Sequence, residues 1–196
     1  LCGGFNSNII KTIRTIANSN ANIHTSVLSI GRKGSDLLSK KFQIHSSHDH
    51  IYDNLNFESS SKIVRIILDE FEQGKYDSVK IVYNRFKNAA TQTVTIESFL
   101  PILTKKENDK SDGSLDLIDY IYEPSQEQII NQLLPKSLKI QLLKSIKDSI
   151  ASEHGARMTA MHKATDNAQE LRDQLKLSYN KARQASITNE ILEIVG

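Results

Sequence analysis

Apolar residues in the first half of the chain occur alternately at helical and at strand spacing. Helical spacing predicts one helix from residue 5 onward, capped by Asn6 or Ser7, and another that begins at the serines at 59–61 and ends at Gly74. A short helix is expected over residues 34–41. The apolar residues that set the two longer helices are Ile9, Ile10, Ile13 and Ile16, then Ile63, Ile66, Ile67, Leu68 and Phe71.

Strand patterns separate these helices. Alternating and β-branched residues predict strands over 25–30, 79–83 and 91–96, a weaker strand over 42–45 and a last short strand over 117–122. Residues 46–56 are expected to be a polar insert and residues 105–114 a charged loop. The alternation predicts an α/β fold with helices on the sheet faces. Because two strands follow each other directly, at least one should be antiparallel.

The last third of the chain has a different pattern. No proline occurs from Lys136 to Val195, and Gly155 is the one interior glycine, so these 60 residues predict a single helix of about 90 Å. Its first part is strongly apolar and is expected to pack on the α/β region, through Leu138, Leu142, Leu143, Ile146 and Ile150. The alternative is a pair of helices that break near Gly155 and fold back on each other.

A stripe of small and apolar residues continues along this helix at spacings of three and four, which is typical of a coiled coil. We call it the small-residue seam; it needs a partner helix that this sequence does not contain. The expected organisation is therefore a globular domain over 1–134 and a coiled-coil helix over 135–196. The seam comprises Met161, Ala164, Ala168, Leu171, Leu175, Ser178, Ala182, Ala185, Asn189 and Leu192.

Composition excludes several classes of protein. A net charge of +2 is too small for a chain that binds nucleic acid along its whole length, and one cysteine cannot form an internal disulfide. The longest apolar run, residues 99–103, is far too short to span a membrane, and no signal peptide is expected. The hydrophobic fraction of 38% is low for one compact globule and favours an elongated part.

Three groups of residues could carry chemistry, but none has a specific pattern. The turn over residues 2–6 could bind an anion through backbone N–H groups, although it lacks the phosphate-loop spacings, and Cys2 has no base beside it in sequence. His45, His48 and His50 with Asp49 and Asp53 lack metal-ligand spacing. No catalytic residue, metal or cofactor is expected, which favours a binding or mechanical protein.

Longer motifs resemble one family closely. Residues 151–161, 164–167 and 179–190 are similar to the C-terminal signature of the ATP synthase gamma subunit. Residues 1–6 resemble that family's glycine motif without its first glycine, and residues 120–124 match it as well. The histidine-rich insert is not part of the family pattern. The opening residues are accordingly expected to follow a strand that precedes this sequence; a flexible leader is the alternative.

The resemblance implies a rotor shaft. It predicts a Rossmann-like three-layer α/β/α domain, incomplete without its first strand, followed by the long coiled-coil helix. It implies a non-catalytic subunit that couples proton flow to ATP synthesis and hydrolysis inside a ring of alpha and beta subunits. Partners would be alpha, beta, epsilon and the c-ring, at the cytoplasmic face of the bacterial inner membrane and in contact with the membrane only through the complex. We hypothesise that the 196 residues alone cannot complete the sheet or bury the seam.

Particular residues match the family's contact positions. Arg157, Arg183, Gln184 and Thr188 resemble residues that contact the beta subunit, and Tyr120, Tyr122 and Glu123 lie on the expected epsilon and c-ring side. A smooth apolar bearing is expected from Ile187, Ile191, Ile194 and Val195. Without the resemblance, each polar residue would be interpreted as part of a solvated helix face. Two other functions stay open: a non-catalytic coiled-coil scaffold, and a nucleotide-using enzyme built on the Gly3-Gly4 turn.

Overall fold

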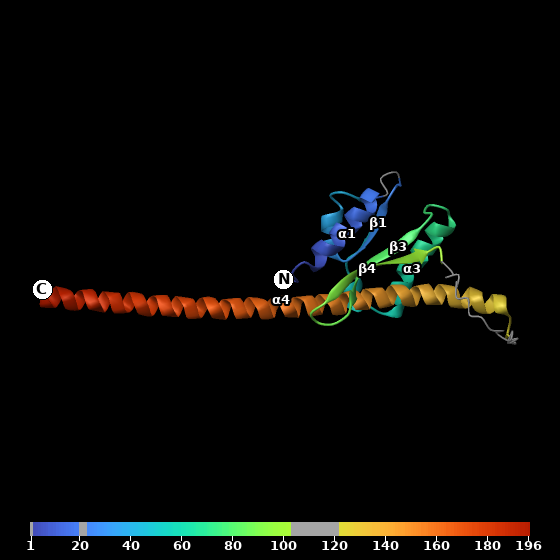
Figure 1. The fold of residues 1–196 in the computed structure, drawn as a ribbon. Helices are drawn as coiled ribbons and strands as arrows, with labels where there is room; N and C mark the ends of the chain where they lie inside the picture. Colours follow the sequence, from blue (N-terminus) through green and yellow to red (C-terminus); the bar gives the residue numbers. More distant parts are fainter. Residues whose placement is uncertain (1, 20–22, 103–121) are drawn as a thin grey trace, which may run out of the picture.

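One helix, α4 (Gln126–Val195), runs the length of the molecule, and the other elements gather around its N-terminal part (Figure 1). The computed structural model describes residues 2–19, 23–102 and 122–196. α4 has 70 residues and is continuous through Gly155. The prediction of one unbroken helix is therefore confirmed, and the alternative of two helices folded back near Gly155 is wrong.

The rest of the described chain forms a mixed α/β body, as the alternating pattern predicted. The helices predicted from residue 5 and from the serines are α1 and α3, and the strands predicted at 25–30, 79–83 and 91–96 are β1, β3 and β4. In chain order the elements are α1 (Phe5–Ser19), β1 (Ser26–Ile30), α2 (Arg32–Leu38), β2 (Gln43–His48), the 3-10 helix η1 (Ile51–Asn54), α3 (Phe57–Glu72), β3 (Val79–Phe86) and β4 (Gln92–Leu100).

The described strands form two separate pairs. β1 and β2 are parallel, whereas β3 and β4 form an antiparallel hairpin, which confirms that at least one strand is antiparallel. β2 extends to His48 and is followed by η1, so the segment 46–56, expected as a polar insert, contains the end of a strand and a 3-10 helix. The expected loop over 105–114 and all of the strand expected over 117–122 except Tyr122 lie outside the described residues.

Four helix boundaries differ from expectation. α1 begins at Phe5, so Asn6 and Ser7 lie within its first turn and neither caps it. α3 is capped by Asn56, whose Oδ1 accepts a 2.7 Å hydrogen bond from Ser59 N while Ser59 Oγ accepts one from Asn56 N, so the serines act inside the first turn. α2 covers 32–38 rather than 34–41. α4 begins ten residues before Lys136, because Ser125 caps it and Pro135 lies within the helix instead of ahead of it.

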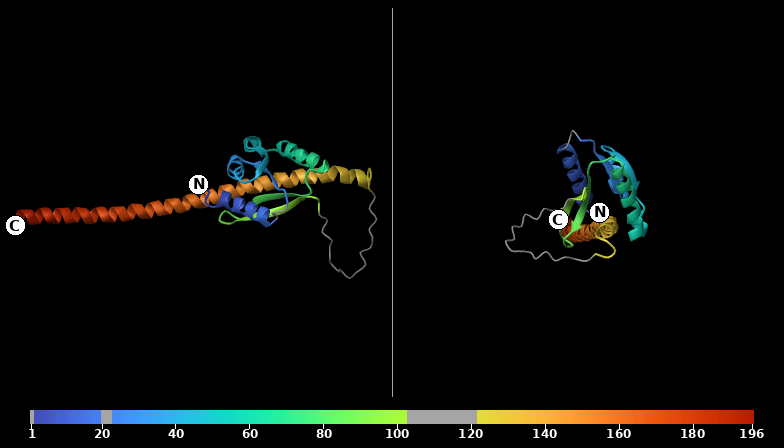
Figure 2. Two further views of the ribbon diagram at one scale, coloured as in Figure 1. Left: turned by 90° about the horizontal axis from the view of Figure 1, so that it is seen from above. Right: turned by 90° about the vertical axis from the view of Figure 1, so that its right-hand side faces the viewer.

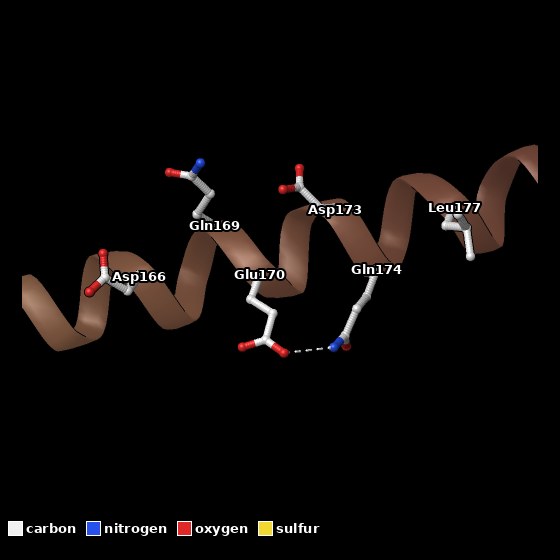
Figure 3. Close-up of a pocket in the computed structure, with 6 residues that line it drawn as sticks. All are labelled: Asp166, Gln169, Glu170, Asp173, Gln174 and Leu177. Carbon is white, nitrogen blue, oxygen red and sulfur yellow. Dashed lines mark hydrogen bonds between the residues drawn. The ribbon is translucent and has the colours of Figure 1, made fainter.

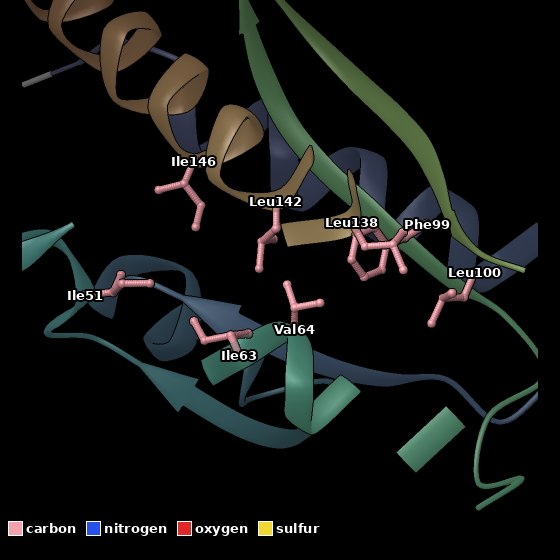
Figure 4. Packing of buried hydrophobic residues seen from close by; sticks show 8 residues of the cluster. All are labelled: Ile51, Ile63, Val64, Phe99, Leu100, Leu138, Leu142 and Ile146. Carbon is pink, nitrogen blue, oxygen red and sulfur yellow. The ribbon is translucent and has the colours of Figure 1, made fainter. Parts of the chain in front are cut away.

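The main core lies where α4 meets α3 and β4. Leu138, Leu142 and Ile146, at spacings of four, point into one apolar cluster, which confirms that the first part of the helix packs on the body (Figure 4). The body contributes Ile51, Ile63, Val64, Phe99 and Leu100. Val64 and Phe99 are almost completely buried. This cluster fixes α4 to the body along about two and a half turns.

A polar contact joins the hairpin to α4 beside that core. The Tyr83 hydroxyl of β3 donates a 2.7 Å hydrogen bond to Glu97 of β4, and Gln141 Nε2 of α4 donates to the other Glu97 oxygen at 3.4 Å. Burial, then the hydrogen bond to Glu97 and its charge, raise the pKa of Tyr83 to about 12. Tyr83 therefore stays protonated and keeps the donor that holds Glu97 toward the helix.

We expect Leu142→Ala to destabilise the body by about 2–5 kcal/mol, because it opens a cavity in the cluster that fixes α4. Leu171→Ala is the matched control, since Leu171 is 57% exposed on the same helix. Urea unfolding followed by circular dichroism measures both. Equal losses in the two variants would contradict a core placed around Leu142.

Candidate partner-binding surfaces

The C-terminal half of α4 is bare. Every residue from Met161 to Gly196 is exposed, and this segment projects well beyond the body in Figure 1 and in the left view of Figure 2. At 1.5 Å per residue the bare part of the helix is about 50 Å long. A helix of this length with exposed leucines and isoleucines is typical of a surface that other proteins cover.

Two different faces run along this bare segment. At about 100° per residue, the expected beta-subunit contacts and bearing residues near the C-terminus fall within one sector of roughly 140°. We call it the coupling face: Arg183, Gln184, Ile187, Thr188, Ile191, Ile194 and Val195. The small-residue seam occupies a different sector of roughly 140°, on the opposite side. One helix can therefore contact a partner helix and a surrounding surface at the same time.

The coupling face contains both hydrogen-bonding and apolar side chains. The Thr188 hydroxyl donates to the carbonyl oxygen of Gln184 at 2.8 Å, one turn back, which fixes its orientation along the helix. Ile194 and Val195 are about four-fifths exposed. The roles expected for these residues as beta-subunit contacts and as a bearing stay predictions, because their partners belong to other chains.

Arg157 lies apart from the coupling face. It is 26 positions, or about 39 Å along the helix, from Arg183. Its Nη2 forms an ion pair with Glu153 and a hydrogen bond to Cys2 Sγ at 3.4 Å. The hydrogen bond to Glu153, with the charges of Cys2 and Glu153, raises the pKa of Arg157. Its guanidinium is thus held by its own chain, and its expected contact with a beta subunit stays a prediction.

The expected epsilon and c-ring residues lie at the other end of α4. Tyr122 and Glu123 are exposed and immediately precede the helix, whereas Tyr120 lies outside the described residues. The structure therefore brings the coupling-face residues together, while Arg157 and the Tyr122–Glu123 pair stand at two separate places. The contact role of Tyr122 and Glu123 also stays a prediction.

The histidine-rich segment is engaged in pairwise contacts. His45 Nε2 lies 2.9 Å from Glu70, and His50 Nδ1 lies 3.3 Å from Asp53. Burial lowers the pKa of His48. Within the described ranges, no three His, Cys, Asp or Glu side chains are arranged to hold a metal ion.

A polar stretch of the bare helix carries three carboxylates on one side. Figure 3 shows residues between Asp166 and Leu177, where Gln174 donates a 3.3 Å hydrogen bond to Glu170. All of these side chains come from the same helix and are exposed. Because no second element of the described chain faces them, these residues do not enclose a ligand.

A cavity of about 690 Å³ inside the body is a feature that spacing alone did not indicate. Five consecutive residues of β1, 26–30, and five of β3, 79–83, line it from two sides. α1 lines it with four isoleucines and α4 with Leu142, Ile146 and Ile150. Of the α1 isoleucines, Ile10 is buried and Ile9, Ile13 and Ile16 are half-buried, so the described residues cover the apolar face of α1 only in part.

In the described parts of the chain, none of the helices combines the length and the hydropathy that crossing a bilayer requires.

Comparison with known proteins identifies relatives of the whole chain. The sequence profile of the ATP synthase family matches residues 1–196. The chain is 57% identical over 196 residues to the ATP synthase gamma chain of Flavobacterium johnsoniae and 40% identical over 197 residues to that of Geotalea uraniireducens. Each alignment covers 100% of this chain and 67% of the relative.

Solved structures of central stalks are also similar. A chain of the Tetrahymena thermophila mitochondrial ATP synthase central stalk and c-ring aligns with a TM-score of 0.64 and 27% identity, over 84% of this chain and 70% of that one. A chain of the Euglena gracilis mitochondrial ATP synthase aligns with a TM-score of 0.67, over 100% and 67% of the two chains. At 22% identity, the second match concerns the fold alone.

Within α4 of the isolated chain, we expect trypsin to cleave first in the bare part, after Arg172, Lys176 and Lys181. In the described chain no tertiary contact protects these sites, whereas Lys144 and Lys147 lie on the packed part of the same helix. Mass spectrometry of a short digestion time course measures the order of cleavage. Earlier cleavage after Lys144 or Lys147 would contradict the division of α4 into a packed and a bare part.

Proposed function

Since the chain belongs to the ATP synthase gamma-chain family, we propose that its bare helix is the shaft that couples proton flow through the membrane sector to ATP synthesis and hydrolysis. The chain is a non-catalytic rotor subunit, part of the central stalk of an F-type ATP synthase. The alternative of an unrelated coiled-coil scaffold is wrong on the same grounds.

The observation that carries the proposal is the bare, two-faced segment of α4. A shaft changes the state of a surrounding beta subunit only if it contacts the states of that subunit differently. The coupling face is suited to this: Arg183 and Gln184 offer directional donors, while the isoleucines slide without bonds that must be broken at each step. The seam, on the opposite side, is closed by a second helix from outside these 196 residues.

The body end of the chain points toward the membrane sector in this proposal. Tyr122 and Glu123, exposed where α4 begins, contact the epsilon subunit and the c-ring. Support comes from the Tetrahymena relative, whose structure contains a central stalk with a c-ring. The bacterial relatives favour the cytoplasmic face of the bacterial inner membrane, where the chain is held through the complex.

We expect the double substitution Arg183→Ala and Gln184→Ala to lower ATP-driven proton pumping about fivefold in the assembled complex, since both directional groups of the coupling face are lost. Pumping is measured by quenching of a pH-sensitive dye in inverted vesicles, alongside ATP hydrolysis.

Lys181→Ala is the matched control, because Lys181 is exposed on a neighbouring turn and lies between the coupling face and the seam, about 20° outside each. Unchanged pumping in the double variant, or an equal loss in Lys181→Ala, would count against a coupling role for this face.

We further propose that the two strand pairs belong to one Rossmann-like sheet in a three-layer α/β/α domain, with an additional strand between β1 and β3. Consecutive residues of both strands line the cavity, and since side chains of a strand alternate between faces, it is the strand edges that face it. Helices α1 and α4 close the other two sides. The cavity thus has the surroundings of an inner strand, which polypeptide outside these 196 residues supplies.

In the isolated chain we expect the cavity-facing amides of residues 26–30 and 79–83 to exchange rapidly with deuterium. In the assembled central stalk they should be protected about tenfold or more, because the additional strand accepts their hydrogen bonds. The amides of β4 that pair with β3 serve as the internal control. Identical protection of β1 and β3 in both states would refute the additional strand.

A further inference from the structure

The body encloses α4 from two sides at the point where the helix leaves it. Ser152 to Thr159 form the last stretch of α4 that contacts the body, and from Met161 onward the helix is bare (Figures 1 and 2). We call this arrangement the collar. It consists of Cys2, Asn84 and Ala89 from the body with Ser152, Glu153, Gly155, Arg157 and Thr159 from α4.

One side of the collar is the β3–β4 hairpin. The Ser152 hydroxyl, fully buried, donates a 2.9 Å hydrogen bond to the carbonyl oxygen of Asn84. Two turns further along, Thr159 Oγ1 donates to the carbonyl oxygen of Ala89 at 3.1 Å. That same oxygen accepts a 2.9 Å hydrogen bond from Gln92 Nε2, which holds the loop in place. Two directional bonds therefore tie the helix to the hairpin.

Gly155 lies between these two bonds and lets the backbones meet. A Cβ atom at this position would stand 3.1 Å from the oxygen and 3.2 Å from the Cα of Ala89. Because both are backbone atoms, a side chain here would push the hairpin away. A helix-interior glycine costs about 1 kcal/mol relative to alanine. The close approach of the hairpin therefore explains why a glycine occupies this position.

The second side of the collar is the N-terminal turn. Arg157, paired with Glu153, donates to Cys2 Sγ at 3.4 Å, just before α1 begins. Glu153 and Arg157 lie roughly 150° around the helix axis from the hairpin contacts. Contacts on two sides, away from the helix axis, resist rotation of the helix about that axis.

We propose that the collar is the clamp that transmits torque between the body and the bare shaft. The apolar cluster around Leu142 holds α4 by packing that has no preferred direction. Such packing resists separation of α4 from the body more than it resists rotation of α4 about its own axis. The collar adds directional bonds and a steric lock, so it sets the angle at which the coupling face points relative to the body. The inference rests on the proposed coupling function, and Ser152, Gly155 and Thr159 are its positioning residues.

The test uses the ATP synthase complex that contains this chain, with Thr159→Val to remove the hydroxyl and Gly155→Leu to displace the hairpin. We expect proton pumping per ATP hydrolysed to fall about fivefold in each variant while hydrolysis continues, because rotation is lost at the clamp. Thr159→Ser keeps the donor and should retain wild-type coupling. A residue needed for folding alone would lower hydrolysis and pumping together.

Matched controls lie on the same helix. Thr165→Val removes a hydroxyl that bonds only within the helix, to Met161 O at 3.0 Å, and Ala151→Leu enlarges an exposed position one turn before Gly155. Wild-type pumping per ATP in Thr159→Val, or an equal loss in Thr165→Val, would overturn the clamp. If the Gly155→Leu variant does not assemble, the result for Thr159→Val alone tests the clamp. Absence of pumping in the wild-type complex would instead refute the proposed function.

Discussion

The structure depends on one constraint: a helix of 70 residues can be buried along only part of its length in a chain of this size. Packing of Leu138, Leu142 and Ile146 against α3 and β4 anchors the first half of α4. The described elements of the body contact α4 no further than Thr159, so from Met161 onward the whole circumference of the helix is exposed. The same interaction that folds the body thus creates the exposed shaft, and the two cannot be changed independently.

Two kinds of contact hold α4 on the body, and they have different effects. The apolar cluster supplies most of the adhesion, since burial of apolar area is large and has no preferred direction. The contacts of Gln141 with Glu97 and of Ser152 with Asn84 are individually modest but directional. Their distribution along the packed half of the helix gives the body a defined orientation on the shaft, which a part that rotates against its surroundings requires.

Spacing of apolar residues predicted the elements well and their ends less well. The isoleucines of α1 and the alternation in β4 are local signals, so the periodicity was sufficient. Pro135 was interpreted as a boundary because a proline normally interrupts a helix, yet the helix begins nine residues earlier at Gln126, after the cap Ser125. Gly155 is needed because the backbone of Ala89, 66 positions away in sequence, lies against it. A contact between such distant positions leaves no pattern in the sequence around Gly155. The coupling-face residues were identified by resemblance, since a bare helix contains no internal partner from which their roles could be derived.

The composition of the seam satisfies two demands that a shaft makes. Alanines allow a partner helix to approach closely, and alanine also has the highest helix propensity. A leucine-rich seam would pair more strongly, but it would expose more apolar area before assembly and favour aggregation. Ala164, Ala168, Ala182 and Ala185 therefore keep the bare segment helical without a large apolar stripe.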